Sequence, residues 1–333
     1  MNQHDSASER IVITRRDHLE LLPWRAPAPT PGEVRVRVAY SAVSFGDVML
    51  RRHVFRDRPP VTVPGYEVVG TVEAAGAGVT SVRPGDKVAA FIEYGGNARH
   101  AIVRASDLVR LPAGVDEAQA AATVLNYATA LGMLEAARLT RGDDFLIHGA
   151  TGGVGSATLD TARALGISAL GTTRGGKRDL FGARLLDARS PTLVGDVRAL
   201  SGGGVRAVFD SRAGRGLWAS RAMLERGGSL IVFGLSSVAK PGFQAAVGTV
   251  GTLASLALFG VLPGKRSAAF AMDKIYRSDP PRVRAWVARA LDLLAAGSIA
   301  PIVGVTLPLA QVAEAHRLLE AGEVVGKVVL DCR

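Results

Sequence analysis

The feature that most constrains the fold is a short apolar run ending in a glycine-rich turn, Phe145-Leu-Ile-His-Gly-Ala-Thr-Gly-Gly-Val-Gly155. The apolar run predicts a buried strand, and the helical spacing of small and apolar residues over 157–165 predicts a helix after the turn. Between them, Ala150, Gly152 and Gly155 occupy the three positions of a dinucleotide-binding fingerprint. Such a turn lets a pyrophosphate lie against backbone N–H groups at a helix N-terminus. We therefore expect a nucleotide site here, with a simple chain reversal as the alternative.

The residues around the next expected strand, 167–173, indicate which dinucleotide binds. NAD sites carry an acidic side chain about 20 residues beyond the glycines, where it accepts hydrogen bonds from the ribose hydroxyls. No Asp or Glu stands between Asp160 and Asp179. Hydroxyls and cations that can hold a phosphate stand there instead, namely Thr172, Thr173, Arg174, Lys177 and Arg178. We expect NADPH rather than NADH, the alternative being solvated loop charges.

Composition limits the class of protein. A chain of 333 residues with 48% hydrophobic content can bury the cores of two domains. Its net charge of +10 comes mainly from scattered arginines, which favours a solvated surface over a nucleic-acid-binding stripe. The single cysteine, Cys332, allows no intramolecular disulfide. The N-terminal residues are polar and lack an apolar signal core, so we expect a cytoplasmic protein.

The segment 245–262 tests the expectation of a soluble protein. It contains no charged residue and is nearly long enough to span a bilayer, but Gly248, Gly251 and Gly260 interrupt it. We expect a buried interface or the wall of an apolar pocket, and keep a membrane span as the alternative.

The two halves of the chain differ in their predicted secondary structure. Residues 11–110 alternate short strands with turns, as in Glu33-Val-Arg-Val-Arg-Val-Ala39, and predict a β-rich domain. From about residue 118, helices alternate with strands, which predicts an α/β fold with a doubly wound parallel sheet covered by helices on both faces. The last segment is expected to return and complete the first domain.

Several motifs in order carry a family resemblance. They are Pro31-Gly-Glu-Val34, Ser44-Phe-Gly-Asp47, Pro64-Gly-Tyr-Glu-Val-Val-Gly70, Val82-Arg-Pro-Gly-Asp-Lys-Val88, His148-Gly-Ala-Thr-Gly-Gly-Val-Gly155, Val208-Phe-Asp210 and Gly326-Lys-Val-Val-Leu330. In these motifs the chain resembles the medium-chain dehydrogenase/reductase family, and within it the zinc-independent quinone oxidoreductase branch. Leu125-Asn-Tyr-Ala-Thr-Ala130 is similar to the subgroup of the synaptic vesicle amine transport protein, and the branch also includes zeta-crystallin.

The resemblance implies a fold and an assembly. A GroES-like catalytic domain would comprise residues 1–120, completed by 266–333, and a Rossmann NADPH-binding domain would comprise 121–265. Substrate and nicotinamide would meet between them. Relatives pair through an edge strand of the Rossmann sheet, so we expect a homodimer, with residues 228–233 and the apolar segment after them as the pairing surface.

Departures from the zinc-dependent relatives restrict the chemistry. Those relatives carry a zinc-binding Cys within the segment matching Ser44–Asp47, a zinc-binding His at the position of Tyr66, and a four-cysteine loop. This chain has none of these, so we expect no metal. Without a Lewis acid to stabilise an alkoxide, the better acceptor is one that delocalises the arriving charge itself. The resemblance therefore implies hydride transfer from NADPH to a quinone or an α,β-unsaturated carbonyl compound, the choice between them left open.

Site residues follow from the same resemblance. The candidates for orienting substrate are Ser44, Asp47, Tyr66, Tyr94 and Tyr127. Asp47 is expected to fix its neighbours, because an ionised carboxylate only accepts hydrogen bonds, and half-buried packing is an equal alternative for Tyr66 and Tyr94. The expected cofactor contacts are Asn126, Thr129, Gly152, Gly153, Val154, Thr173, Arg174, Lys177, Phe233, Gly234, Leu235 and Lys327. His148 is expected to make a structural hydrogen bond.

Two other functions stay open. Phe55 and Ala188 stand where relatives often carry Tyr, so a nucleotide-binding protein without turnover is one rival. A reductase-like fold recruited to a non-redox biosynthetic step is the other. For the reductase, we expect an apolar small-molecule substrate and no nucleic-acid partner.

Overall fold

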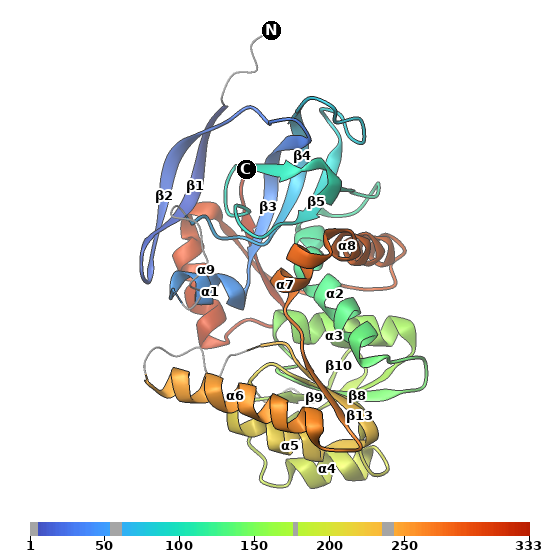
Figure 1. Cartoon of the computed structure of the whole chain (residues 1–333). Helices are drawn as coiled ribbons and strands as arrows, with labels where there is room; N and C mark the ends of the chain where they lie inside the picture. Colours follow the sequence, from blue (N-terminus) through green and yellow to red (C-terminus); the bar gives the residue numbers. More distant parts are fainter. Residues whose placement is uncertain (1–5, 54–61, 176–178, 235–242) are drawn as a thin grey trace. The chain divides into compact units, whose positions relative to one another are not determined.

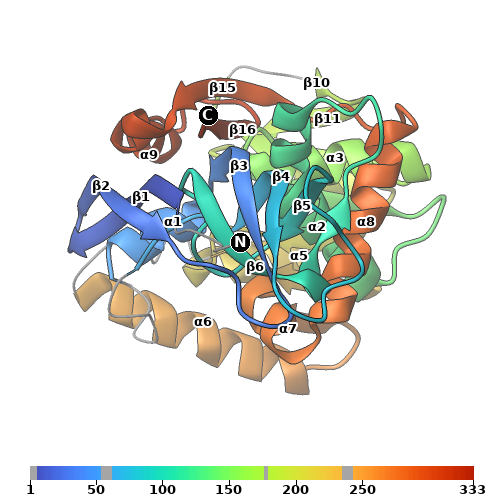
Figure 2. The same cartoon turned by 90° about the horizontal axis from the view of Figure 1, so that it is seen from above.

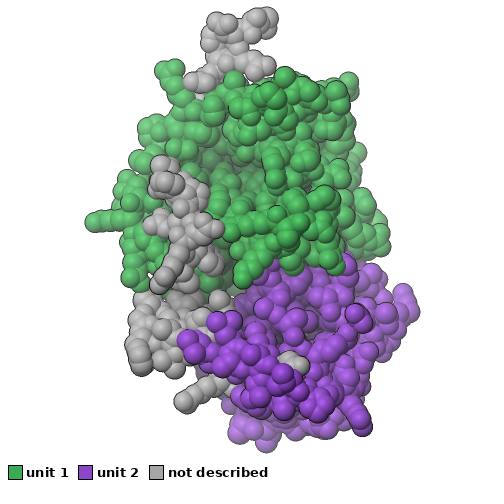
Figure 3. All heavy atoms as spheres, in the orientation of Figure 1, with its two compact units in different colours: residues 1–128, 273–333 green, residues 129–272 purple. Residues whose placement is uncertain are grey.

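The computed structural model describes residues 6–53, 62–175, 179–234 and 243–333. It divides the chain into two compact units, which Figure 3 shows in green and purple. Unit 1 comprises Met1–Ala128 and Asp273–Arg333, and unit 2 comprises Thr129–Met272. The expected domain boundaries, at residues 120/121 and 265/266, stay a prediction.

Unit 1 is β-rich. Among the described residues it holds a seven-stranded sheet in the order β15-β16-β3-β4-β5-β7, with β6 also paired to β3, and a separate antiparallel pair, β1 and β2. Its strands are β1 (Ser6–Arg15), β2 (His18–Ala26), β3 (Glu33–Val43), β4 (Glu67–Ala75), β5 (Lys87–Phe91), β6 (His100–Arg104), β7 (Val109–Arg110), β15 (Val303–Pro308) and β16 (Lys327–Asp331). Figure 2 shows the C-terminal strand β16 beside β3, with which it pairs antiparallel, so the end of the chain returns to complete this sheet.

The alternating pattern of β3 gives the sheet its two faces. Val34, Val36 and Val38 are buried in one apolar cluster that includes Leu330 of β16. On the alternate positions, Arg35 binds Glu73 across the sheet, with 2.6 Å between Nε and Oε2. Period-2 alternation of this kind places one face of a strand in the core.

Helices complete unit 1. They are α1 (Phe45–Arg51), the first part of α2 (Glu117–Ala137), α7 (Met272–Ser278), α8 (Pro280–Ala295) and α9 (Val312–Ala321), with 3₁₀ turns at Ala105–Asp107 and Leu309–Gln311. Sequence signals set their ends: Asp279 caps α8 by accepting from the backbone N–H of Arg282, and Pro280 follows it.

Unit 2 is built on a sheet in the order β10-β11-β9-β8-β12-β13-β14, and among its described strands the neighbours are parallel except for the antiparallel pair β10 and β11. The strands are β8 (Asp144–His148), β9 (Ser168–Thr173), β10 (Asp179–Leu180), β11 (Ala183–Asp187), β12 (Val205–Asp210), β13 (Leu224–Val232) and β14 (Arg266–Ala269). The helices are α3 (Gly153–Leu165), α4 (Leu193–Leu200), α5 (Leu217–Ala222) and α6 (Phe243–Val261), with a 3₁₀ turn at Gly214–Gly216. Figure 1 shows α3 on one face of this sheet and α4 and α5 on the other. The predicted Rossmann-type parallel sheet is confirmed.

The edge of this sheet differs from the expected pairing surface. Residues 228–233 were expected to offer a free edge, but β13 is covered on one side by β12 and on the other by β14. The residues of β14 return in parallel beside β13, so among the described strands β14 stands at the edge. The expectation for residues 228–233 is wrong because it overlooked this short strand after the apolar segment.

The charge-free segment forms most of α6. Phe259 of this helix is buried against Trp218 of α5, with ring centroids 4.8 Å apart. Other positions face outward: Val250, Leu253 and Val261 are 66%, 63% and 77% exposed. The helix is therefore only partly buried. Among the described residues, no helix combines the length and the apolar character that crossing a membrane requires.

A buried ion pair joins the N-terminal and C-terminal parts of unit 1. Glu67 begins β4, Lys327 begins β16, and Lys327 Nζ lies 2.7 Å from Glu67 Oε1 while both side chains are almost fully enclosed. Burial raises the pKa of Glu67 to about 7, although the Lys327 charge opposes the shift. The lysine makes it possible to bury this carboxylate but does not fully offset its loss of water.

The raised pKa of Glu67 predicts how stability depends on pH. The Glu67 carboxyl stays protonated up to about pH 7 in the folded chain, but only up to about pH 4.5 in the unfolded chain. Because the folded chain binds more protons between pH 4.5 and 7, its free energy of unfolding falls as the pH rises through this range. Replacement by Gln removes the titration. Urea unfolding should show wild type losing roughly 3 kcal/mol relative to Glu67→Gln over this range.

The exposed Glu323→Gln variant serves as the control and should follow wild type at every pH. A difference between wild type and Glu67→Gln that stays constant with pH would contradict the raised pKa.

Candidate functional site

The glycine turn of unit 2 is built around one close backbone contact. A Cβ at Gly155 would lie 2.2 Å from the carbonyl oxygen of Gly149, so only glycine fits there. Gly149 itself has a φ of +74°, which favours glycine. Ala150 is fully buried and its N–H donates to the carbonyl of Thr172, 2.9 Å away. These contacts hold the turn tightly between β8 and α3.

The first turn of α3 presents backbone donors. Its N-cap is Gly152, which has no side chain to satisfy them, and the first turn contains no acidic residue. The N–H groups at the start of a helix lack partners within the helix and carry a partial positive charge. Gly152, Gly153 and Val154 are all partly exposed. The geometry therefore suits an anionic group at this helix end, and it brings these three predicted cofactor residues together.

The end of β9 carries the residues expected to meet a 2′-phosphate. Thr173 is buried, and its Oγ1 accepts from the N–H of Gly175, while Arg174 is exposed. Lys177 lies outside the described residues. No carboxylate is predicted here from the sequence, but Asp187 ends β11 directly beside Thr173. Its Oδ1 already accepts from the backbone N–H of Arg189, 2.9 Å away.

Three strand ends meet at the same edge of the sheet. Ser211, after β12, donates from Oγ to the carbonyl of His148 at the end of β8. Gly234, after β13, passes so close to Ser211 that a Cβ there would lie 2.6 Å from the Ser211 carbonyl oxygen. The predicted nicotinamide residues Phe233 and Gly234 therefore lie at the edge that carries the glycine turn. Leu235 lies outside the described residues.

His148 is locked in a buried network. Its Nδ1 lies 3.0 Å from Thr172 Oγ1, and its Nε2 lies 3.1 Å from Arg212 Nη2. A guanidinium only donates, so Nε2 accepts and the ring proton belongs on Nδ1. Burial lowers the pKa of His148 below its usual range, although Asp210 opposes the shift. Ser220, which also touches Nε2, donates to Asp210. His148 is a neutral hydrogen-bonding group of the core.

A second polar cluster lies in unit 1, at the start of α1. Ser44 caps the helix, and Asp47 at the third position reaches back to it, so that Oδ2 accepts from both the N–H and the Oγ of Ser44 at 2.8 Å. Its Oδ1 accepts from the N–H of Gly65 at 2.8 Å. Burial raises the pKa of Asp47, and these hydrogen bonds oppose the shift. Asp47 thus ties α1 to the turn before Tyr66.

Tyr66 lies against this cluster. A Cβ at Gly46 would lie 3.1 Å from the Tyr66 hydroxyl oxygen, so the absence of a side chain at Gly46 gives the ring room. The ring also stacks on Phe91, with centroids 6.1 Å apart. Burial, and then the charge of Asp47, raises the pKa of Tyr66 well above its usual value. Its hydroxyl therefore stays protonated and can donate.

The remaining predicted residues occupy varied places. Tyr94 is partly buried, and burial raises the pKa of its hydroxyl. Tyr127, Asn126 and Thr129 are buried along α2. Lys327, expected to contact cofactor, lies in unit 1, where its ammonium is paired with Glu67.

Glu67 is not among the residues predicted from the sequence, although it stands in the Pro64-Gly-Tyr-Glu67 motif. The signal available in the sequence was a carboxylate directly before the apolar run Val68-Val69-Gly70. For metals, the described part of the chain contains no cluster of three or more His, Cys, Asp or Glu side chains that could hold an ion.

Two family models match the chain. Residues 30–113 match the model described as an alcohol dehydrogenase GroES-like domain, and residues 182–330 match the one described as a zinc-binding dehydrogenase. The first falls within unit 1, and the second begins in unit 2 and ends in the last strand of unit 1. The predicted combination of a GroES-like domain with a Rossmann-type sheet is confirmed.

Curated relatives include both large and similar-sized proteins. The chain is 33% identical over 346 residues to a mycocerosic acid synthase-like polyketide synthase of Mycolicibacterium smegmatis, covering 98% of this chain and 16% of that protein. It thus spans about a sixth of that synthase's length. It is 27% identical over 322 residues to the synaptic vesicle membrane protein VAT-1 homolog of Homo sapiens, covering 94% and 82% of the two chains.

Solved structures agree with these matches. Mycobacterial Rv1454c complexed with NADPH has a TM-score of 0.83 at 29% identity, covering 98% of this chain and 99% of that one. The human synaptic vesicle membrane protein VAT-1 homolog-like protein has a TM-score of 0.82 at 26% identity, covering 98% of each chain. With its sequence motifs, both matched models and these structural likenesses, the chain belongs to the medium-chain dehydrogenase/reductase family.

Proposed function

We propose that this protein is an NADPH-dependent reductase that delivers hydride to a quinone or an α,β-unsaturated carbonyl compound without a catalytic zinc. The observation that carries the proposal is the glycine turn leading into α3. It offers backbone donors, no capping side chain and no acidic residue in the first helical turn. A pyrophosphate is the group that such a helix end recognises in dinucleotide enzymes.

The shape of the turn supports the same cofactor. The contact between Gly155 and the Gly149 carbonyl packs α3 against the strand end, so the helix N-terminus is fixed before any ligand arrives. Gly152, Gly153 and Val154 would hold the pyrophosphate through their N–H groups. Phe233 and Gly234, at the same edge of the sheet, would contact the nicotinamide.

The preference for NADPH over NADH rests on the end of β9. Thr173 and the exposed Arg174 offer a hydroxyl and a guanidinium suited to a 2′-phosphate. Asp187 stands nearby, but one carboxylate oxygen already accepts from the N–H of Arg189. A relative of 29% identity was solved with NADPH, which favours the same cofactor here.

The chemistry would divide between cofactor and protein. NADPH, when bound, supplies the hydride. For an unsaturated carbonyl substrate, hydride would add to the β-carbon, leaving NADP⁺, and the negative charge would rest on the carbonyl oxygen. A proton from water would then add to the α-carbon. We assign the hydrogen bond to that oxygen to Tyr66, because its protonated phenol lies beside Gly46 in the cluster of Ser44 and Asp47.

The zinc-free part of the proposal rests on side chains. Tyr66 stands where zinc-dependent relatives carry a His. Asp47 has both oxygens engaged, one with Ser44 and the other with Gly65. Although one matched model is described as zinc-binding, these residues offer a hydrogen-bonded cluster rather than a set of free ligands.

The likeness to polyketide synthases favours the unsaturated acyl substrate over the quinone. These relatives are named as a mycocerosic acid synthase-like polyketide synthase and a mycoketide-CoA synthase, and the chain matches one segment of each. Among acyl substrates, an α,β-unsaturated thioester can take up hydride because its conjugated carbonyl delocalises the negative charge that arrives.

Anaerobic stopped-flow mixing tests the reductase directly. NADPH-loaded protein should lose its nicotinamide absorbance on mixing with enoyl thioesters, enones or quinones.

Gly155→Ala should weaken NADPH binding at least about tenfold, because the new Cβ would force the turn open.

Gly195→Ala, in open space on α4, is the matched control and should leave binding unchanged. Binding of NADPH without oxidation by any acceptor would favour a nucleotide-binding protein without turnover and would contradict the reductase.

The preference for NADPH over NADH can be tested at Arg174. Arg174→Gln should raise the Kd for NADPH by about tenfold and leave that for NADH unchanged, because only NADPH carries the phosphate. Fluorescence titration with each nucleotide measures both constants. An equal loss for the two nucleotides would show that Arg174 does not read the 2′-phosphate.

A further inference from the structure

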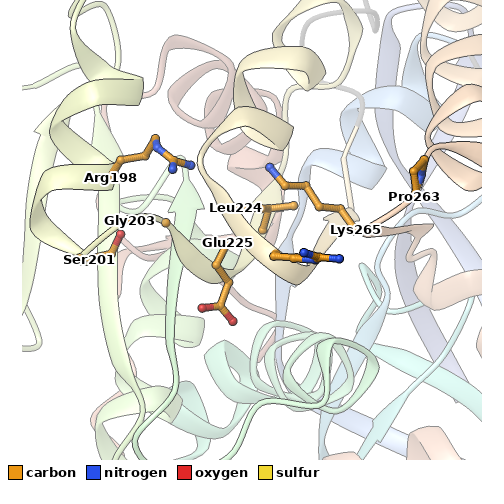
Figure 4. A pocket seen from close by; sticks show the side chains of 11 residues that line it. Arg198, Ser201, Gly203, Leu224, Glu225, Pro263 and Lys265 are labelled. Carbon is orange, nitrogen blue, oxygen red and sulfur yellow. The ribbon is translucent and has the colours of Figure 1, made fainter.

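An open pocket lies at the end of the unit 2 sheet where β12, β13 and β14 begin. Its volume is about 620 Å³, within the range of small-molecule sites. Figure 4 shows the lining side chains, which are Arg198, Ser201, Gly202, Gly203, Gly204, Leu224, Glu225, Arg226, Pro263, Gly264 and Lys265.

The pocket is separate from the glycine turn. The turn follows the carboxyl end of β8, and Ser211 and Gly234 follow the carboxyl ends of β12 and β13. The pocket residues precede or begin those same parallel strands: Gly204 comes before β12 and Lys265 comes before β14. Parallel strands start at one edge of a sheet and end at the other, so the two sites lie at opposite edges.

The lining is strongly cationic. Arg198, Arg226 and Lys265 contribute three positive charges, whereas Glu225 is the one carboxylate among the lining residues. Glu225 is engaged outside this trio, because its Oε1 lies 3.3 Å from Arg206 Nη1. Figure 4 shows the charged ends of Arg198 and Lys265 pointing toward one another and the Glu225 carboxylate turned away.

The positive charges around the pocket change the pKa of Lys265. Its ammonium donates to the carbonyl of Arg221 at 2.8 Å. Burial lowers the pKa of Lys265, and the charges of Arg221 and Arg198 lower it further. Positive charges are thus held close together at this site, and a bound anion would reduce their mutual repulsion.

Glycines leave part of the wall bare. A Cβ at Gly202, Gly203 or Gly264 would meet no atom within 4 Å, so open space stands over the backbone at these positions. Bare backbone beside converging cations lets an oxyanion approach closely, as it does in phosphate-binding loops.

We infer that this pocket is a second anion-binding site, which holds the phosphate group of a phosphorylated small molecule between Arg198 and Lys265. Arg198 supplies a planar donor fork and Lys265 a point charge, a pair suited to a multivalent oxyanion. The site would act independently of the proposed cofactor, whose phosphates belong at the opposite edge of the sheet.

Calorimetric titration of the full chain with inorganic phosphate and with pyrophosphate tests the site, at an ionic strength held constant with NaCl and in the presence of excess NADPH. Wild type should bind one anion with pyrophosphate tighter than phosphate. Arg198→Gln combined with Lys265→Gln should weaken pyrophosphate binding at least about tenfold. Lys265→Arg, which keeps the charge, should retain most of the affinity.

Arg184→Gln is the matched control, because Arg184 is exposed on the same unit and does not line the pocket. It should bind as wild type does, and circular dichroism should show all variants folded. Unchanged affinity in the double variant, or equal losses in Arg184→Gln, would overturn the site. The same titration without NADPH should add a second anion at the glycine turn, so failure of the proposed cofactor site would be seen separately.

Discussion

The contact between Gly155 and the carbonyl oxygen of Gly149 is the constraint on which the nucleotide half of this molecule depends. Because no side chain fits between them, α3 begins directly against the end of β8. The same edge is tightened by Ser211, which binds the His148 carbonyl, and by Gly234, which crosses close to Ser211. Three strand ends and one helix N-terminus are thereby fixed together. A site assembled from backbone can meet a charged ligand without paying to reorganise.

In unit 1 the corresponding constraint is buried charge. Asp47 and Glu67 are both enclosed, and each is held by specific donors: Ser44 and Gly65 for the first, Lys327 for the second. Burial raises the pKa of both carboxyls, so neither is a relaxed surface group. Lys327 comes from β16, so the return of the chain end places a cation beside the buried Glu67 in addition to pairing β16 with β3.

The neighbours of Tyr66 fix the position of its ring and keep its hydroxyl protonated. The ring occupies the space left by Gly46 and stacks on Phe91, and the nearby carboxylate disfavours phenolate. The hydroxyl is a donor at neutral pH, as a phenol ordinarily is, and the raised pKa keeps it protonated in alkaline solution as well. Under the proposed function, such a donor and a bare helix end are the two groups that a hydride transfer to a conjugated carbonyl needs from the protein.

Local patterns predicted much of this structure. The glycine turn, the alternation of β3 and the strand-helix texture of unit 2 are short-range signals, and each forms the predicted element. Long-range pairings were missed because no local pattern shows which segments pair: β14 occupies the sheet edge, Asp187 lies beside Thr173 through β11, and Glu67 meets Lys327 from the far end of the chain. The cationic pocket was missed for the same reason, since Arg198 and Lys265 come from distant segments.

Transfer of the label from stereospecifically deuterated NADPH tests the central claim most directly. The protein, NADPH carrying deuterium at either face of C4, and an enoyl thioester would be incubated together, and the product examined by mass spectrometry. Direct hydride transfer predicts one deuterium at the β-carbon of the saturated product, from one face of the nicotinamide only. A saturated product without deuterium from either labelled cofactor, or no product with any acceptor of this class, would contradict the account.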